Sequence, residues 1–344
     1  MRAMPIKRFL PVLAALAAAC SPAPSMAQDP ELSFDAYLQL LIAKARAEGV
    51  SEATIQRMTY DLTPNDTVIR LDRSQPGTAT SSGYPPLAPY IDRHVDRARI
   101  DGGRSVFHGN GSTLLRIENE YGVPAPILVA IFGHETAYGR VTGNFDLARS
   151  LATLAWEGRR RDLFASEFID LLKVADKGYP RSQLQGSWAG AFGNPQFLPS
   201  VYLRLAKDGD GDGRADIFSN RADTFASIAN YFRDAGWRRG QPWGVRAYVP
   251  AGFDVDAYRT KINSPVCPRV HERHSQWKTV AEWRALGVQP QRALGDDVMA
   301  SLFQPDGPGA PAWLLTTNYR VILEYNCSNY YAMSVGILAD EIAQ

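Results

Sequence analysis

The sequence has few cysteines, almost no net charge and no hydrophobic run long enough to cross a membrane. Its 344 residues include three cysteines, and the formal net charge is +1. These absences argue against a small disulfide-rich protein and against a nucleic-acid binder that works through a basic surface. With 45% hydrophobic and 21% charged residues, the composition is that of a globular protein. The length allows two to three domain-sized units, and we find no internal repeat.

The N-terminal segment has the pattern of a secretory signal. Three basic residues precede the apolar run 9–19, which is too short to span a bilayer. The segment 25–27 then offers a small-x-small cleavage site before Gln28. We therefore expect residues 1–27 to be a signal peptide and the protein to leave the cytoplasm.

Cys20 offers a second way to process this segment. Residues 17–20 read Ala-Ala-Ala-Cys, which resembles a bacterial lipobox in which Cys20 is lipidated and becomes the new N-terminus. A typical lipobox has Leu at the position of Ala17, so the alternative is that Cys20 belongs to the discarded peptide. Both routes predict export, and lipidation would add an outer-membrane anchor.

The other two cysteines, Cys267 and Cys327, are a disulfide candidate. An exported protein folds in an oxidising compartment, and two cysteines remain in the mature soluble form. The alternative is two separate buried thiols. The two cysteines are sixty residues apart and lack the paired spacing typical of zinc ligands, so we do not interpret them as a zinc site.

The chain alternates between helical and mixed patterns. Apolar residues at helical spacing predict helices within 31–60, 90–121 and 329–343, and the Pro-, Gly- and Ser-rich stretch 74–89 reads as a linker. Residues 313–317 are strand-like. We expect a mainly α (α+β) protein, divided into 28–103 (N-terminal helical region and linker), 104–240 (helical core), 241–319 (small mixed or β subdomain) and 320–344 (C-terminal segment that returns to the core).

Glu135 lies in the most apolar of the predicted helices. The segment 124–138 begins with Pro and is followed by Gly, the residues that commonly mark the start and the end of a helix. Glu135 shares one helix face with three apolar residues before it, Leu128, Ile131 and Phe132. It therefore extends an apolar stripe.

Such a position suits a general acid. Removal from water raises the pKa of a carboxyl group, which then stays protonated near neutral pH. The alternative is a glutamate at a fraying helix end, half in water. His134 is adjacent in sequence and points elsewhere on the helix, so we interpret it as structural.

The segment 186–200 is rich in small residues, with aromatic and amide side chains between them. It reads Gly-Ser-Trp-Ala-Gly-Ala-Phe-Gly-Asn-Pro-Gln-Phe-Leu-Pro-Ser. Small residues allow close backbone approach to a flat ligand such as a sugar, while aromatic rings cover its apolar face. The alternative is a tight turn that packs helices together.

Four segments occur together in one order: Gly-His-Glu-Thr-Ala-Tyr-Gly at 133–139, the loop 186–200, the stretch 227–237, and the pair Tyr325-Asn326. This combination resembles the membrane-bound lytic murein transglycosylase B family. The resemblance covers about residues 105–240 and continues through 320–340. It implies a lysozyme-like catalytic core and a periplasmic enzyme.

The resemblance also implies an activity and a set of site residues. The family cleaves the β-1,4 bond between N-acetylmuramic acid and N-acetylglucosamine in peptidoglycan and leaves a 1,6-anhydromuramic end. Its single catalytic glutamate corresponds to Glu135. Its substrate-binding residues correspond to Ser187, Gln196, Tyr325, Asn326, Arg159 and Arg160. From the residues alone, 159–161 would be a solvated charge run and Asn326 a candidate cap of the C-terminal helix.

One carboxyl group suffices for such a reaction. Ordinary glycosidases place two carboxylates across the scissile bond, but no motif marks a second acid here. A lone Glu135 would act first as acid and then as base. Two alternatives stay open: a lysozyme-like muramidase with an unmarked second carboxylate, and a non-catalytic glycan-binding protein. We expect a monomer that binds peptidoglycan glycan strands, with no nucleic-acid partner and no required cofactor.

The segment 208–219 resembles an EF-hand loop. Asp208, Asp210 and Asp212 occupy positions 1, 3 and 5, and Asp216 occupies position 9. Position 12, normally a bidentate Glu, is Ser219. The transglycosylase B family carries an EF-hand-like loop here, so the segment is a candidate for a weak structural calcium site. The alternative is a loop of Asx turns that caps the next helix.

Overall fold

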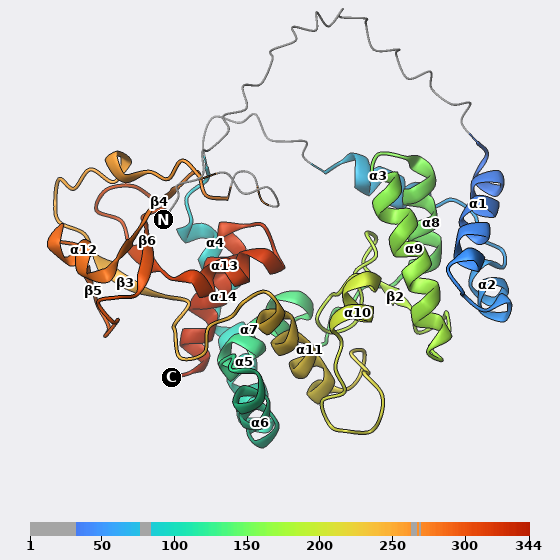
Figure 1. The fold of residues 1–344 in the computed structure, drawn as a ribbon, viewed down its shortest axis with the longest axis horizontal. Coiled ribbons are helices and arrows are strands. Elements are labelled where there is room, and N and C mark those ends of the chain that lie inside the picture. The colour runs from blue at the N-terminus through green and yellow to red at the C-terminus, as the bar shows by residue number, and fades with distance from the viewer. Residues whose placement is uncertain (1–31, 76–83, 263–266, 268–269) are drawn as a thin grey trace, which may run out of the picture.

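The computed structural model describes residues 32–75, 84–262, 267 and 270–344, and it is mainly helical, with a five-stranded sheet and a two-stranded sheet (Figure 1). The predicted α+β class is confirmed. The proposed signal peptide 1–27 and Cys20 lie outside the described residues. In the part of the chain that is described, no helix is long and apolar enough to cross a membrane.

One helical body contains the middle and the C-terminal end of the chain. Its apolar side chains form a shared core around a helix whose residues are buried on nearly every side. The helices of this body are α4 (Ala88–His94), α5 (Arg97–Gly109), α6 (Gly111–Tyr121), α7 (Ala125–Thr136), α11 (Arg221–Asp234), α13 (Thr317–Tyr325) and α14 (Asn329–Ile342). Helix α7 packs against α5, α11 and α14, which places it at the centre (Figure 1).

A second helical body joins the N-terminal helices to a later segment. Its apolar side chains form a separate cluster. The helices are α1 (Phe34–Ala47), α2 (Glu52–Thr59), α3 (Asp66–Arg73), α8 (Leu147–Glu157), α9 (Arg161–Asp176) and α10 (Pro199–Leu205). In Figure 1 the blue helices α1 and α2 stand beside the green helices α8 and α9, although about a hundred residues separate them in sequence.

The third body is a five-stranded antiparallel sheet in the order β4-β6-β7-β3-β5. Its strands are β3 (Gly244–Tyr248), β4 (His274–Thr279), β5 (Gln289–Pro290), β6 (Met299–Phe303) and β7 (Ala312–Leu315), accompanied by η1 (Asp256–Tyr258) and α12 (Val280–Ala285). The fully buried Trp283 of α12 donates its indole N–H to the carbonyl of Ala300 in β6. A disulfide joins Cys267 to Cys327, the pair expected from the sequence, and ties this body to the end of α13.

The packing divides the chain differently from the expected boundaries. The boundary between 103 and 104 falls inside α5, and that between 319 and 320 falls inside α13. Only the boundary at 240, between α11 and β3, separates two elements. The reason is that the N-terminal helices complete the core of α8 and α9, a long-range contact that no local pattern reveals.

Candidate active site

Helix α7 ends directly after Glu135 in an unusual way. Ala137 and Tyr138 both adopt left-handed backbone conformations, with φ of 50° and 62°. The ring of Tyr138 then folds back over Gly133, where an added Cβ would lie 2.6 Å from it. The Tyr138 hydroxyl donates to the carbonyl of Arg99 at 2.6 Å. A residue other than glycine at 133 would displace this ring, so the sequence around the acid is tightly constrained.

Glu135 is largely enclosed, and one hydrogen bond satisfies it. The Tyr331 hydroxyl on α14 donates to Glu135 Oε1 at 2.5 Å. Burial raises the pKa of Glu135 to about 7, against a smaller opposing effect of the Tyr331 hydrogen bond. Among the residues that the structure describes, no cation and no second carboxyl group contributes to this shift. The group can therefore donate a proton and take one back near neutral pH.

His134 turns away from Glu135, as its place on the helix predicts. Burial lowers its pKa to about 3, so the ring is neutral. It packs 5.6 Å from the ring of Tyr331 and 6.3 Å from the ring of His94, between centroids. His134 thus contributes packing on the far side of Tyr331.

Sequence reasoning missed Tyr331. Its ring is 7% exposed, and burial together with the nearby Glu135 raises its pKa well above the ordinary value, so its hydroxyl stays a donor. Nothing in the local pattern of α14 distinguishes it from other buried aromatic residues. The contact with Glu135 spans 196 positions in sequence and exists only in the folded chain.

The loop 186–200 folds into two tight turns. Strand β2 (Gln185–Gly186) pairs with β1 (Phe145–Asp146), and a β-bridge between Phe192 and Phe197 closes the turn that contains Gln196. Gln196 adopts a left-handed conformation, and its Nε2 donates to the carbonyls of Gly193 (2.9 Å) and Thr142 (3.2 Å). These bonds leave the side-chain oxygen of Gln196 available to a ligand.

Ser187 occupies the other turn of this loop. Its Oγ accepts the N–H of Ala191 at 3.0 Å and keeps its own hydrogen to donate. The loop contacts the C-terminal helices through Tyr325, whose hydroxyl donates to the carbonyl of Pro195 at 2.5 Å. Glu135 contributes to the raised pKa of Tyr325, which places the two groups in one electrostatic neighbourhood.

Asn326 is exposed at the end of α13. The alternative that it caps the C-terminal helix is wrong, because Ser328 is the N-cap of α14 and accepts the N–H of Tyr331. Asn326 is instead the C-terminal cap residue of α13, so the N-cap of α14 falls two residues later than the sequence suggested. The Asn326 side chain is therefore available for a ligand.

Arg159 and Arg160 lie directly before α9, which begins at Arg161, on the second helical body. Both bind the carboxylate of Asp72 on α3: Arg159 Nε at 2.7 Å and Arg160 Nη2 at 2.5 Å. Asp72 is 1% exposed, while the two arginine side chains remain 39% and 38% exposed. The two arginines are therefore held by a buried carboxylate and are not a freely solvated charge run. Asp72 is a second residue that sequence reasoning missed.

Comparison with known proteins places this arrangement in a family. Residues 33–340 match the transglycosylase SLT domain family. The chain belongs to this family. It is also 31% identical, over 314 residues, to membrane-bound lytic murein transglycosylase B of Escherichia coli K12, covering 89% of this chain and 82% of that protein.

Solved structures of transglycosylases have the same fold. SltB3 from Pseudomonas aeruginosa, in complex with NAG-anhNAM-pentapeptide, superposes with a TM-score of 0.81 at 36% identity, covering 90% of this chain and 80% of that one. The Escherichia coli lytic transglycosylase Slt35, in complex with calcium, superposes with a TM-score of 0.73 at 29% identity, covering 89% and 92%. The predicted lysozyme-like architecture is confirmed.

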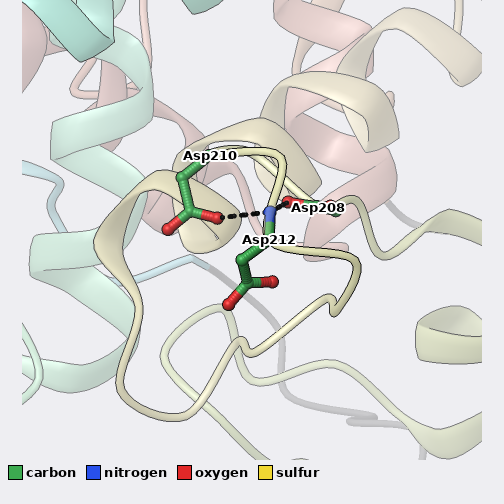
Figure 2. Close-up of side chains that lie close together, drawn as sticks. All are labelled: Asp208, Asp210 and Asp212. Carbon is green, nitrogen blue, oxygen red and sulfur yellow. Dashed lines mark hydrogen bonds between the residues drawn. The ribbon is translucent and has the colours of Figure 1, made fainter.

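The Asp-rich loop of this transglycosylase brings three of its four acidic residues together. Oxygens of Asp208, Asp210 and Asp212 lie within 4.8 Å of one another, and all three residues are exposed (Figure 2). The carboxylate of Asp216 instead accepts the N–H groups of Phe218 and Ser219. Three convergent carboxylates suit a calcium ion, although the loop lacks the bidentate ligand at position 12.

Proposed function

We propose that this protein cleaves peptidoglycan as a lytic transglycosylase in which Glu135 is both acid and base. The observation that carries the proposal is the enclosed Glu135, with a pKa raised to about 7 and a single hydrogen bond from Tyr331. Membership of the SLT family and the SltB3 complexes with NAG-anhNAM-pentapeptide and NAG-NAM-pentapeptide support the substrate class.

The reaction follows from one protonated carboxyl group. Glu135 gives its proton to the glycosidic oxygen, and the bond from that oxygen to the muramic C1 breaks. The Glu135 carboxylate then accepts the proton of the muramic 6-hydroxyl while that oxygen bonds to C1. The products are a free N-acetylglucosamine hydroxyl and a 1,6-anhydromuramic ring. Glu135 ends protonated, and no water is consumed.

The substrate contacts that we propose fall into two groups. Ser187, Gln196 and Asn326 keep hydrogen-bonding atoms available and would bind sugar hydroxyl and acetamido groups. Tyr325 would hold the loop through Pro195, since its hydroxyl is already engaged. Arg159 and Arg160 would contact carboxylates of the substrate with the N–H groups that Asp72 does not use.

We also propose that Asp208, Asp210 and Asp212 hold a calcium ion. It would offset two of the three negative charges and stabilise the loop, and it has no part in the chemical step. The convergence of their oxygens and the calcium complex of the related Slt35 support this assignment.

For cellular location, we propose export to the periplasm. The signal-like pattern of 1–27 and the membrane-bound relative in Escherichia coli support it. Cleavage before Gln28 and lipidation of Cys20 predict different N-terminal peptides. Mass spectrometry of the mature N-terminus, from protein expressed with its leader, distinguishes them.

The decisive experiment is product analysis. Purified peptidoglycan is digested with the protein, and the fragments are weighed by mass spectrometry. Anhydro-muropeptides, absent with Glu135→Gln, are the expected result. Reducing muramic ends would instead identify a muramidase, and binding without cleavage a glycan-binding protein.

A further inference from the structure

We propose that Asn194 is a positioning residue that holds the end of α7, and with it Glu135, against the turn that carries Gln196. The inference rests on the function proposed above for Glu135. Asn194 is 5% exposed and lies within the turn 193–196. It bonds to three separate segments of the chain, each through a different atom.

The first contact reaches the catalytic helix. The carbonyl oxygen of Asn194 accepts the Oγ1 hydroxyl of Thr136 at 3.2 Å. Thr136 directly follows Glu135, and its Oγ1 also accepts the N–H of Gly139 at 3.1 Å. Because the chain leaves α7 in a left-handed conformation, no further helical turn supports Glu135 from this side. The Thr136 hydroxyl lies between the carbonyl of Phe132, at 3.3 Å within α7, and that of Asn194, so this contact joins the last turn of the helix to the loop.

The two residues that follow Asn194 connect it to the proposed substrate-binding residues. Pro195 accepts the Tyr325 hydroxyl through its carbonyl, and Gln196 bonds back to Gly193 through its side chain. A shift of Asn194 would therefore move the acid, the amide and the Tyr325 contact relative to one another. Misplacement of reacting groups by about 1 Å is enough to slow catalysis strongly.

The remaining contacts anchor Asn194 itself. Its backbone N–H donates to the carbonyl of Ile217 at 2.7 Å, and its Nδ2 donates to Thr224 Oγ1 at 3.1 Å. Thr224 is fully buried on α11, and Ile217 lies at the end of the Asp-rich loop. Because the Asn194 side chain makes this contact through Nδ2 and Thr224 accepts it through Oγ1, substitution at 194 or 224 tests the anchor directly.

The test compares Asn194→Ala and Thr224→Val with Thr224→Ser, which keeps the hydroxyl. Asn230→Ala is the matched control: Asn230 is also buried, and its Nδ2 donates to the carbonyl of Leu205. Four quantities are measured for each variant: kcat and KM on peptidoglycan, melting temperature, and the pKa of Glu135 by carbon NMR of the labelled side chain.

We expect Asn194→Ala and Thr224→Val to lower kcat about tenfold with KM within about twofold, the size of effect expected for one lost hydrogen bond. A looser last turn admits water, so the pKa of Glu135 should fall toward its ordinary value. Thr224→Ser should keep kcat and the pKa of Glu135 at their wild-type values. Asn230→Ala should lower the melting temperature and leave kcat and the pKa of Glu135 unchanged.

Loss of melting temperature alone, with kcat and the Glu135 titration unchanged in folded Asn194→Ala and Thr224→Val, would overturn the inference. If Asn194→Ala does not fold, the two Thr224 variants decide the matter. An inactive parent protein would refute the proposed function instead, and the NMR titration would still report on Asn194.

Discussion

Glu135 on α7 and Asp72 on α3 are both carboxyl groups withdrawn from water, but their neighbours differ. Glu135 has a neutral partner, Tyr331, and its pKa is raised to about 7 by burial. Burial acts in the same direction on Asp72, but hydrogen bonds and charges from Arg159 and Arg160 reverse it and lower the pKa. Desolvation alone therefore does not determine the state of a buried acid. The charge of its neighbours makes one group a proton donor and the other a permanent anion.

Glu135→Gln should produce the largest loss of lytic activity. Loss of acid–base catalysis is expected to lower lytic activity at least about a hundredfold, because the amide cannot donate the proton. Release of anhydro-muropeptides measures it. Glu167→Gln provides the matched control: Glu167 on α9 is also buried with a raised pKa, its carboxylate accepts the Ser200 hydroxyl, and it has no part in the proposed reaction. Near-normal turnover of Glu135→Gln would contradict the assignment.

The same substitution should change stability in a pH-dependent way. Burial raises the pKa of Glu135 from 4.5 to about 7, so ionisation opposes the folded state. Wild-type stability relative to Glu135→Gln should therefore fall as pH rises from about 4.5 to about 7, by at most about 3 kcal/mol. Melting curves at pH 4 and pH 8 test this. Equal differences at both values would show that Glu135 does not titrate in this range.

The pH dependence of catalysis distinguishes the two carboxyl groups further. Glu135 must start protonated, so kcat/KM should fall about tenfold per unit above its pKa of about 7. The Tyr331 hydrogen bond lowers that pKa. Tyr331→Phe should therefore move the alkaline limb to higher pH, by about one unit. A downward movement, or none, would show that Tyr331 does not stabilise the carboxylate.

Asp72→Asn should affect stability and not the pH profile. It removes the anion that holds Arg159 and Arg160, at a cost of about 1–3 kcal/mol once the exposure of both arginines is considered. Denaturant titration measures it. Arg97→Gln is the control, since Arg97 is 91% exposed and pairs with Asp101, which is 54% exposed. A shifted alkaline limb in Asp72→Asn would mean that the two regions are electrostatically coupled.

Gln196→Ala and Asn326→Ala should have smaller kinetic effects. Each loses one hydrogen bond to a neutral group, worth roughly 0.5–1.5 kcal/mol, or up to about tenfold in rate. Gln196→Ala should also lower the melting temperature, because its Nε2 bonds Gly193 and Thr142. Asn326→Ala should leave the melting temperature unchanged, since its side chain is exposed. Unchanged kinetics in both variants would remove them from the site.

Calcium should give the smallest of these effects, a change in melting temperature. The Asp-rich loop is a third environment for carboxyl groups, because its acids are exposed and lie next to one another. Asp208, Asp210 and Asp212 are exposed, and their oxygens lie within 4.8 Å of one another. An ion bound to the folded state raises the melting temperature by mass action. Millimolar calcium should therefore stabilise the wild type, and Asp212→Ala should abolish the difference between calcium and chelator. An unchanged wild-type melting temperature would leave the loop as a plain turn.

The sequence was sufficient for features that depend on local pattern. Helical spacing predicted the helices around 34–59, 97–121 and 329–342, and the apolar surroundings of Glu135 indicated a raised pKa. It was insufficient wherever a partner comes from a distant segment. Tyr331 and Asp72 have no local signature, because their roles arise from contacts across 196 and 87 positions. Helix α7 also proved buried on nearly all sides, so the predicted apolar stripe was only part of its buried surface.

The long separation between Tyr331 and Glu135 has a consequence for when the enzyme becomes active. A chain that emerges N-terminus first exposes α7 well before α14, and contacts of high sequence separation form late in folding. Until α14 packs against α7, the acid lacks its phenolic partner and the cover that keeps water away. The hydrogen bond between Glu135 and Tyr331 can therefore form only after nearly the whole chain has emerged. A fragment that ends before residue 331 lacks both this bond and the cover of α14.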